Sequence, residues 1–524
     1  MDDIQPQAGH PRRRAILAVL CLSLLIVVID NTILNTALPT LAKALDASTP
    51  DLQWITDGYT LTFAALLIVA GALGDRYGRR RALLLGLVVF AAGSIAAALS
   101  TDAAFLIGAR ALMGVGAAFV MPATLSILTA VFPARERAGA IGAWSAVTGI
   151  GIVIGPTLGG LLLNHFSWGS VFWINVPLVA IALIAVLTVI PDLPGRARSV
   201  QPARRERLDL IGAVLSAAAL VTIVDAVIEG PDRGWLSATT LGEALLGVAL
   251  FATFIARELT TANPLIDVRV FRHRAFSAAT SAIGLTFFAL FGSLFALTQY
   301  LQLVHGYSPL SAGVRALPFA GAVLVLSPLS TLLARRLGVR WVVSAGLTLM
   351  GGGLLLLTQS TPTSAYSFLA TGVAIMGAGM GLVMAPAGES IMSVLPPQQA
   401  GVGSAVNDTV QELGGSLGVA VIGSVVSAAF RHSIDASTLP ETLRTAARPS
   451  IADAEGVAAH AGALGGQVVT TAQQAFTTAM THGFAVAGIT ALAGAVLMAF
   501  TLPRRQPAVT PATTPIERDE VLVG

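Results

Sequence analysis

Residues 15–38 read AILAVLCLSLLIVVIDNTILNTAL, an apolar stretch that carries a single carboxylate, Asp30. A run of about 20 apolar residues is long enough to cross the hydrocarbon core of a membrane as an α-helix. A charged side chain at that depth costs about 3 kcal/mol or more, so it is usually retained for ions, protons or substrate. This stretch therefore predicts a membrane-spanning helix with a task inside the bilayer.

The composition of the whole chain agrees with a membrane protein. Hydrophobic residues make up 55% of the 524 residues and charged residues only 11%, whereas a soluble domain carries about 25% charged residues. The net charge of +3 does not indicate a nucleic-acid partner, and one cysteine cannot form a disulfide framework. No P-loop motif occurs, so we expect no nucleotide-driven step, and we expect neither a metal nor a cofactor.

Further apolar stretches of similar length follow the first, which predicts an all-α protein with fourteen transmembrane helices. We place these spans at 15–38, 52–74, 81–100, 103–130, 138–163, 170–190, 208–229, 238–257, 275–303, 309–334, 339–359, 364–392, 401–430 and 474–501.

The basic residues orient these spans. With the N-terminus in the cytoplasm, 24 of the 31 basic residues fall in cytoplasmic segments. Lysine and arginine in short loops remain on the cytoplasmic side of the membrane. A missed helix would invert every later loop, so this distribution supports fourteen spans with both termini cytoplasmic, in the inner (plasma) membrane.

The chain also contains an internal repeat. Residues 113–122 read MGVGAAFVMP, and residues 376–386 read MGAGMGLVMAP. ERAGAIG at 136–142 and QQAGVGS at 398–404 follow at similar distances. Parallel repeats of this kind are a transporter architecture, with the substrate site between the halves near the middle of the bilayer. We therefore expect two six-helix bundles related by a pseudo-twofold axis, plus two inserted helices.

The corresponding segments cover the whole chain. They are a cytoplasmic tail at 1–14, the first bundle at 15–190, a linker at 191–207, the inserted helices at 208–257, a second linker at 258–274, the second bundle at 275–501 and a tail at 502–524. The second bundle includes an extracellular loop at 431–472, whose small and polar residues predict a mostly flexible segment with a short amphipathic helix.

Charged residues inside the first bundle are the strongest candidates for function. Asp30, Asp57 and Arg110 fall within predicted spans 1, 2 and 4, toward the outer half of the membrane by helix rise. We expect a buried ion pair between Asp30 and Arg110, with Asp57 as a further acid. Such a pair either takes part in proton transfer or only fixes helix packing.

A second acidic group lies in the second bundle. Asp408 and Glu412 are four residues apart, so they share one helix face and titrate as a pair. They suit a proton site or a site for a cationic substrate, and Glu412 is the deeper. Glu389, nearer the cytoplasmic end of its span, is a gate residue or a solvated cap. Acids outnumber bases within the spans, which favours cations over anions.

Other residues complete the predicted site. Aromatic side chains that can line a greasy cavity include Tyr59, Trp144 and Phe288. Arg315 is expected to extend to the outer surface. The substrate-binding set is therefore Glu412, Asp408, Glu389, Asp57, Tyr59, Trp144 and Phe288.

Two glycine-containing motifs complete the inventory. GALGDRYGRRR at 71–81 permits a tight turn and close helix approach, or serves simply as a basic loop that orients the chain. GIGIVIGPTLGG at 149–160 either packs helices closely or bends as the protein changes state. The residues of these motifs that we single out are Gly71, Gly74, Asp75, Arg76, Gly78, Arg79, Gly155, Pro156 and Gly159.

Several of these motifs, in order along the chain, resemble the major facilitator superfamily. GALGDRYGRRR is similar to its loop between spans 2 and 3, LIGARALMGVGAA at 106–118 to its span-4 motif, and GIGIVIGPTLGG to its span-5 antiporter motif. IDNTILNTALP at 29–39, WITDGYTLTFAALL at 54–67 and GVGSAVNDTVQELGGSLGVAV at 401–421 resemble its fourteen-helix drug:proton antiporter branch, the quaternary-ammonium and multidrug exporters. Met113 departs from the glutamine usual in the span-4 motif.

The resemblance implies proton-coupled export, by alternating access, of small amphipathic and cationic compounds. It implies that Asp30, Arg110, Asp57, Asp408 and Glu412 couple protons, and that Asp75 belongs to a latch that holds the two halves together. We expect a monomer whose partners are substrate, protons and membrane lipid. The alternatives are a dedicated exporter of one endogenous metabolite, antibiotic or lipid, and a membrane enzyme acting on lipid-linked substrates, for which the scattered histidines offer no catalytic group.

Overall fold

The computed structural model describes residues 10–191, 209–261, 264–265, 268–394 and 400–502, and these residues are almost entirely helical. The helices up to residue 189 are α1 (Arg13–Leu45), α2 (Thr49–Tyr77), α3 (Arg79–Ala98), α4 (Ala103–Val131), α5 (Ala134–His165), α6 (Ser170–Trp173) and α7 (Asn175–Val189). Then follow α8 (Leu210–Ile228), α9 (Gly230–Arg233) and α10 (Ala238–Thr260).

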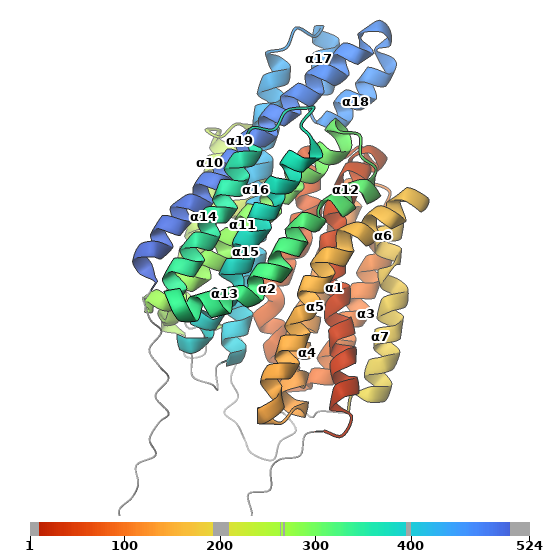
Figure 1. Ribbon diagram of the computed structural model, residues 1–524. Coiled ribbons are helices and arrows are strands. Elements are labelled where there is room, and N and C mark those ends of the chain that lie inside the picture. The colour runs from red at the N-terminus through yellow and green to blue at the C-terminus, as the bar shows by residue number, and fades with distance from the viewer. Residues whose placement is uncertain (1–9, 192–208, 262–263, 266–267, 395–399, 503–524) are drawn as a thin grey trace, which may run out of the picture.

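The later helices complete the bundle. They are α11 (Arg274–Gln299), which continues as a π-helical turn (Tyr300–Val304), α12 (Pro309–Arg315), α13 (Leu317–Leu337), α14 (Val339–Leu357), α15 (Tyr366–Val394), α16 (Ala400–Asp435), α17 (Glu441–Ala447), α18 (Ile451–His460) and α19 (Gly465–Thr501). The long helices lie side by side (Figure 1). Most of the predicted tails 1–14 and 502–524 and of the linker 191–207 lies outside the described residues.

The expectation of an all-helical membrane protein is confirmed. Among the described residues, 12 helices are long and apolar enough to cross a membrane. This number does not include α2 and α5. These helices have 29 and 32 residues, and the structure does not describe all of their side chains. Within the described part of the chain, the predicted count of fourteen is therefore not confirmed.

The bundle has two distinct ends. Helix α1 begins and α19 finishes at one end, which we call the terminal face, whereas α17 and α18 lie at the other, the cap face (Figure 1). The predicted loop 431–472 is thus not mostly flexible, because α16 extends to Asp435, two short helices follow, and α19 begins at Gly465. Lys43 at the end of α1 forms a 2.5 Å ion pair with Glu455 of α18, which ties the cap to the first helix.

Helix neighbours in the first half of the chain recur in the second half. Helix α1 packs against α5, α2 against α4, and α3 against α4. In the same way α11 packs against α16, α13 against α15, and α14 against α15. The helices of each set therefore have corresponding neighbours.

Small residues at matching positions let these helices approach closely. A Cβ atom on Gly116 of α4 would lie 2.7 Å from the Gly86 carbonyl oxygen of α3. A Cβ atom on Gly346 of α14 would lie 2.8 Å from the Gly379 carbonyl oxygen of α15. The turns that precede α3 and α14 match as well, since Gly78 and Gly338 have φ of 114° and 90°, a region that favours glycine.

Helix α8 lies between the two sets of helices. It packs against both α2 and α16, where Leu61, Val224, Ile228 and Ala420 form a small apolar cluster. The Ser424 hydroxyl of α16 donates a hydrogen bond to the Val227 carbonyl oxygen, 2.6 Å away. Helix α10 packs on α8, so the inserted pair covers one side of the α2–α16 contact.

The glycine contact between α3 and α4 generates a stability prediction. In Gly116→Val, the new side chain would lie 2.5 Å from the Phe90 backbone nitrogen, and overpacking of this kind costs about 1–3 kcal/mol. We expect a lower thermal unfolding midpoint for the purified protein in detergent. Gly108→Val is the matched control in the same helix, because nothing lies within 4 Å of its Cβ position. Equal midpoints for both variants would show that this contact does not limit packing.

Candidate functional site

A fully buried ion pair lies at the centre of the first set of helices. Arg110 Nη1 of α4 lies 2.6 Å from Asp30 Oδ2 of α1, and the two side chains are 0% and 1% exposed. The predicted pairing of these residues is therefore present. A charge-assisted hydrogen bond of this length is strong, and each partner depends on the other because a lone buried charge is costly.

Neutral polar groups complete this ion pair. The Asn175 Nδ2 group of α7 donates to Asp30 Oδ1 at 2.8 Å and to Ser94 Oγ of α3 at 3.2 Å. Arg110 Nε donates to the Ile55 carbonyl oxygen of α2 at 3.2 Å. Five helices thus converge on one pair of charges. The sequence analysis did not identify Asn175 or Ser94, although an asparagine within an apolar span was a readable signal.

The guanidinium of Arg110 also contacts an aromatic ring and a thioether. Its carbon lies 4.3 Å from the centre of the buried Tyr59 ring, a cation–π geometry. Nη1 lies 4.0 Å from the Met113 sulfur, which is a weak acceptor. Among the described residues, Nη2 has no hydrogen-bond partner, so the guanidinium retains donor capacity.

Asp57 lies apart from the ion pair. Its side chain is fully buried in α2, and the Thr60 hydroxyl donates to its Oδ1 at 3.4 Å. Ser416 of α16 lies beside it. Asp57 therefore faces the second set of helices at the α2–α16 contact.

The predicted acids of the second set occupy different environments. Glu412 of α16 is half-buried and interacts electrostatically with Asp408, one turn earlier, and with Arg110 of the first set. Asp408 accepts a 3.2 Å hydrogen bond from Asn407 Nδ2. Glu389 of α15 is exposed. Glu412 is therefore the acid of the second set that the fold brings toward Arg110.

These residues define a central cluster that contains Asp30, Arg110, Tyr59, Asn175 and Glu412. The Tyr59 hydroxyl interacts electrostatically with both Asp30 and Glu412, so carboxylates from both sets of helices surround one tyrosine and one guanidinium. The two sets of helices meet at this cluster.

The predicted aromatic residues have packing contacts. Trp144 is buried, and its Nε1 donates to Thr124 Oγ1 at 3.3 Å between α5 and α4. Phe288 is half-buried on α11, and a Cβ atom on Gly418 of α16 would collide with its backbone. The Trp144 side chain therefore joins α5 to α4, whereas at Phe288 the close contact with α16 is made by the backbone of α11.

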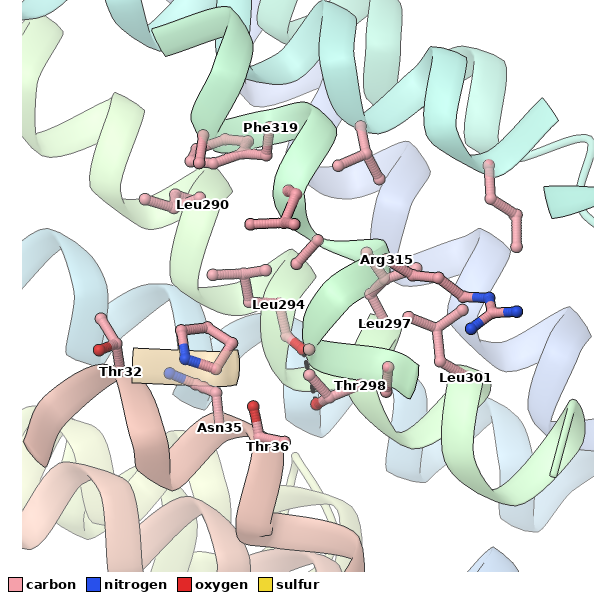
Figure 2. Close-up of a pocket in the computed structure, with 18 of the residues that line it drawn as sticks. Thr32, Asn35, Thr36, Leu290, Leu294, Leu297, Thr298, Leu301, Arg315 and Phe319 are labelled. Carbon is pink, nitrogen blue, oxygen red and sulfur yellow. Dashed lines mark hydrogen bonds between the residues drawn. The ribbon is translucent and has the colours of Figure 1, made fainter. Parts of the chain in front are cut away.

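A mainly apolar pocket lies between the two sets of helices, toward the cap face. It is lined by α1, α5, α11, α12, α13 and α15, with residues such as Asn35, Pro156, Leu294, Arg315, Phe319 and Tyr366 (Figure 2). Its position between the halves agrees with the predicted location of a substrate site. None of the predicted site acids is among the described residues that line it, so this pocket is not the acidic cavity that the sequence analysis expects.

Arg315 occupies a different environment from the expected one. Instead of extending to the surface, its guanidinium carbon stacks 3.9 Å from the Tyr307 ring centre and 5.3 Å from that of Tyr366. Its Nη1 donates to the Ser311 carbonyl oxygen at 3.2 Å. The expectation failed because the two tyrosines, which lie far apart in the sequence, provide a better environment than lipid headgroups.

The predicted motif between α2 and α3 forms a tight corner at the terminal face. Arg79 Nη1 donates to the Ser126 carbonyl oxygen of α4 at 2.8 Å, and Arg76 is exposed. Cβ atoms on Gly74 and Gly71 would lie 3.1 Å and 3.4 Å from Ala82 and Pro122. The side chain of Asp75 lies outside the described residues.

The glycines of α5 pack against α1 and α12. A Cβ atom on Gly155 would overlap the Thr32 hydroxyl, and one on Gly159 would lie 3.3 Å from Ile33. A Cβ atom on Gly313 of α12 would overlap the Pro156 carbonyl group. This motif thus joins the two sets of helices near the pocket.

A helical bundle with buried charges and a pocket between two similarly arranged halves defines a membrane transporter. Known proteins place the chain within that class. The family model described as Major Facilitator Superfamily matches residues 20–419. The chain therefore belongs to the major facilitator superfamily and is a transporter, not an enzyme; members of this family bind small-molecule substrates.

Individual relatives agree with this assignment. The chain is 38% identical over 411 residues to the multidrug resistance protein Stp of Mycobacterium tuberculosis (strain CDC 1551 / Oshkosh), covering 78% of this chain and 74% of Stp. It is 35% identical over 498 residues to the tetracenomycin C resistance and export protein of Streptomyces glaucescens, covering 93% and 91%. A bacterial homologue of the human lysosomal transporter Spinster shares the fold, with a TM-score of 0.67, 18% identity and coverage of 94% and 98%.

The buried ion pair generates a prediction about stability. Arg110→Gln leaves the Asp30 carboxylate buried without its cation, which costs about 3–5 kcal/mol. We expect a marked fall in the thermal unfolding midpoint of the purified protein. The double variant Arg110→Gln/Asp30→Asn removes both charges and should regain part of that loss. If the double variant is less stable than Arg110→Gln alone, the two charges do not stabilise one another.

Proposed function

We propose that this protein is a proton-coupled exporter of small amphipathic compounds, including cationic ones, that works by alternating access. The names of its relatives as multidrug resistance and drug export proteins support export. The single observation that carries the proposal of proton coupling is the central cluster, where Glu412 of α16 interacts with the Arg110 guanidinium that holds Asp30.

In this proposal, proton entry and substrate export are coupled because protons and cationic substrate compete for the same carboxylates. A proton on Glu412 removes the negative charge that attracts a cationic substrate, whereas loss of that proton restores it. Asp408 lies one turn away, and its charge acts on Glu412. Asp57, buried beside Ser416 at the α2–α16 contact, is a further proton site. Protons and cationic substrate therefore occupy the acids in turn.

The proton on the acids also changes how the two sets of helices hold together. Arg110 Nη2 has no hydrogen-bond partner among the described residues, so the guanidinium can turn toward Glu412 when this acid is ionised. Protonation of Glu412 leaves Arg110 with Asp30 alone. The electrostatic attraction between the two sets then differs between proton-loaded and proton-free protein, which biases the equilibrium between states.

The cap-face contacts are the ones that must break when the protein opens outward. Gln53 Nε2 of α2 donates to the Val419 and Ala420 carbonyl oxygens of α16 at 3.0 and 2.9 Å. Gln302 Nε2 donates to the Thr36 carbonyl oxygen of α1 at 2.8 Å. These hydrogen bonds join the two sets of helices toward the cap face, so the structure represents a state that is closed on that side.

The membrane arrangement in this proposal has fourteen transmembrane helices, with α2 and α5 added to the 12 apolar helices. Two six-helix bundles, 15–190 and 275–501, flank the inserted pair at 208–257, and the protein acts as a monomer surrounded by lipid. The terminal face lies in the cytoplasm of a bacterial cell and the cap face outside the plasma membrane. The distribution of basic residues supports this orientation.

The corner between α2 and α3 acts as a conformational latch at the cytoplasmic face. The tight turn at Gly78 and the Arg79 hydrogen bond to Ser126 fix this corner against α4. In the proposal, Asp75 joins it and Gly155, Pro156 and Gly159 form the flexing contact on α5. The close approach of α5 to α1 and α12 supports that role.

Two single substitutions of acidic residues provide the functional test. We expect Glu412→Gln to abolish export of the cationic dye ethidium driven by a pH gradient, because the variant lacks both the titrating group and the attraction for a cation. Asp225→Asn is the matched control, since Asp225 lies in α8 and pairs with Arg233 at 3.1 Å, away from the central cluster. Dye efflux and proton release are measured together in vesicles at matched expression.

The opposite pattern would contradict the assignment. If Glu412→Gln exports ethidium at the rate of the unsubstituted protein while Asp225→Asn is inactive, the coupling site lies in the inserted helices. A variant that fails to reach the membrane is recognised by its expression level and size-exclusion profile.

A further inference from the structure

The pocket between the two sets of helices has a chemistry of its own. One wall is a row of leucines on α11 and the π-helical turn that continues it, Leu290, Leu294, Leu297 and Leu301 (Figure 2). Phe287 and Phe291 stack with ring centres 5.9 Å apart and also line the pocket, as do Phe319 and Tyr366. Flat apolar walls of this kind suit a polycyclic aromatic molecule.

One polar group on the α1 side of the pocket is not satisfied. Asn35 is 5% exposed and lines the pocket. Its Nδ2 donates a long hydrogen bond to the Asn31 carbonyl oxygen at 3.3 Å. Within the described part of the chain, its Oδ1 has no hydrogen-bond partner. A buried acceptor without a hydrogen bond is unfavourable, so a ligand that supplies a hydrogen-bond donor gains affinity there.

The other polar residues of the α1 side do not compete for that role. The Thr32 hydroxyl donates to the Val28 carbonyl oxygen at 2.9 Å, and the Thr36 carbonyl oxygen accepts the hydrogen bond from Gln302. On α11, the Thr298 hydroxyl donates to the Leu294 carbonyl oxygen at 2.9 Å. Asn35 Oδ1 differs from these groups because, within the described part of the chain, it is a buried amide acceptor with no hydrogen bond.

Arg315 sets the charge preference of the pocket. It is the one charged side chain among the described residues that line the pocket, and it lies at the opposite end of the pocket from Asn35, with its guanidinium extending away from Asn35 (Figure 2). Among the described residues its Nε has no hydrogen-bond partner. A fixed positive charge in an apolar site disfavours a permanent cation and favours acceptor oxygens.

We propose that this pocket binds uncharged or anionic polycyclic aromatic compounds, with a ligand hydroxyl donating to Asn35 and a ligand acceptor oxygen at Arg315. The proposal rests on the proposed export function and deepens it. It separates two substrate classes, since cations are attracted to Glu412 at the central cluster and hydroxylated polycycles fill the pocket toward the cap face. Asn35 is then a specificity-determining residue.

The test compares two probes on the purified full-length protein. Tetracenomycin C is an uncharged polycyclic aromatic compound with hydroxyl donors and carbonyl acceptors, whereas methyl viologen is a dication that lacks N–H and O–H donors. We expect tetracenomycin C to bind, and Asn35→Ala to weaken its binding by about tenfold through loss of one hydrogen bond. Methyl viologen binding should not change in Asn35→Ala.

Two further variants make the result specific. Asn35→Asp retains an acceptor oxygen in either protonation state, so tetracenomycin C binding should remain within about threefold of the unsubstituted protein. Thr348→Val removes a hydroxyl of α14 that donates to the Ser344 carbonyl oxygen of its own helix and does not line the pocket, so it should leave binding unchanged. If Asn35→Ala does not fold, Arg315→Gln should weaken tetracenomycin C and relatively favour methyl viologen.

Two outcomes would overturn the proposal: no binding of tetracenomycin C by the unsubstituted protein, or equal binding of tetracenomycin C by Asn35→Ala. Failure of the pocket proposal is distinguishable from failure of the export function. If ethidium export remains coupled to protons and dependent on Glu412 while tetracenomycin C does not bind, only the pocket proposal is wrong.

Discussion

The burial of two opposite charges in an apolar bundle is the constraint on which the first half of this protein depends. Asp30 and Arg110 are removed from solvent and lie 2.6 Å apart. Because neither is tolerable alone at this depth, α1 and α4 must remain in register. Asn175 extends the requirement to α7 and the Ile55 carbonyl oxygen extends it to α2. An interaction that costs free energy to bury thus specifies the arrangement of four helices, with Ser94 adding α3.

The second set of helices contributes polar side chains that face the buried charges of the first set. Helix α16 packs closely on α11 through glycines, and the same helix carries Glu412 toward Arg110 and Ser416 toward Asp57. Charge chemistry is therefore concentrated where α16 approaches the first set of helices. The apolar pocket is separate from it and lies between α1, α11 and α12–α13. In our account, the separation allows one protein to exchange protons at one place and hold a greasy molecule at another.

The sequence was informative about elements and about the costliest residues. The length of the apolar stretches predicts the helices. The presence of Asp30 and Arg110 within spans predicts that they pair, because burying either charge alone costs more free energy than burying the pair. Neutral polar residues carry a weaker signal, since Asn175 costs less to bury and its partners lie on other helices. Arg315 was misplaced for a related reason, because Tyr366 of α15 approaches it only through the tertiary fold. The order of the 431–472 loop was also missed, since its short helices are stabilised by contacts such as the one between Lys43 and Glu455.

The central claim is that substrate export and proton entry are one coupled process. It is tested most directly with the purified protein in liposomes that contain ethidium and a pH-sensitive dye, diluted into ethidium-free buffer at equal pH and clamped membrane potential. The account predicts that ethidium efflux drives protons inward, so that the lumen acidifies, and that Glu412→Gln abolishes this acidification. Ethidium efflux by the unsubstituted protein without any change in luminal pH would contradict the account.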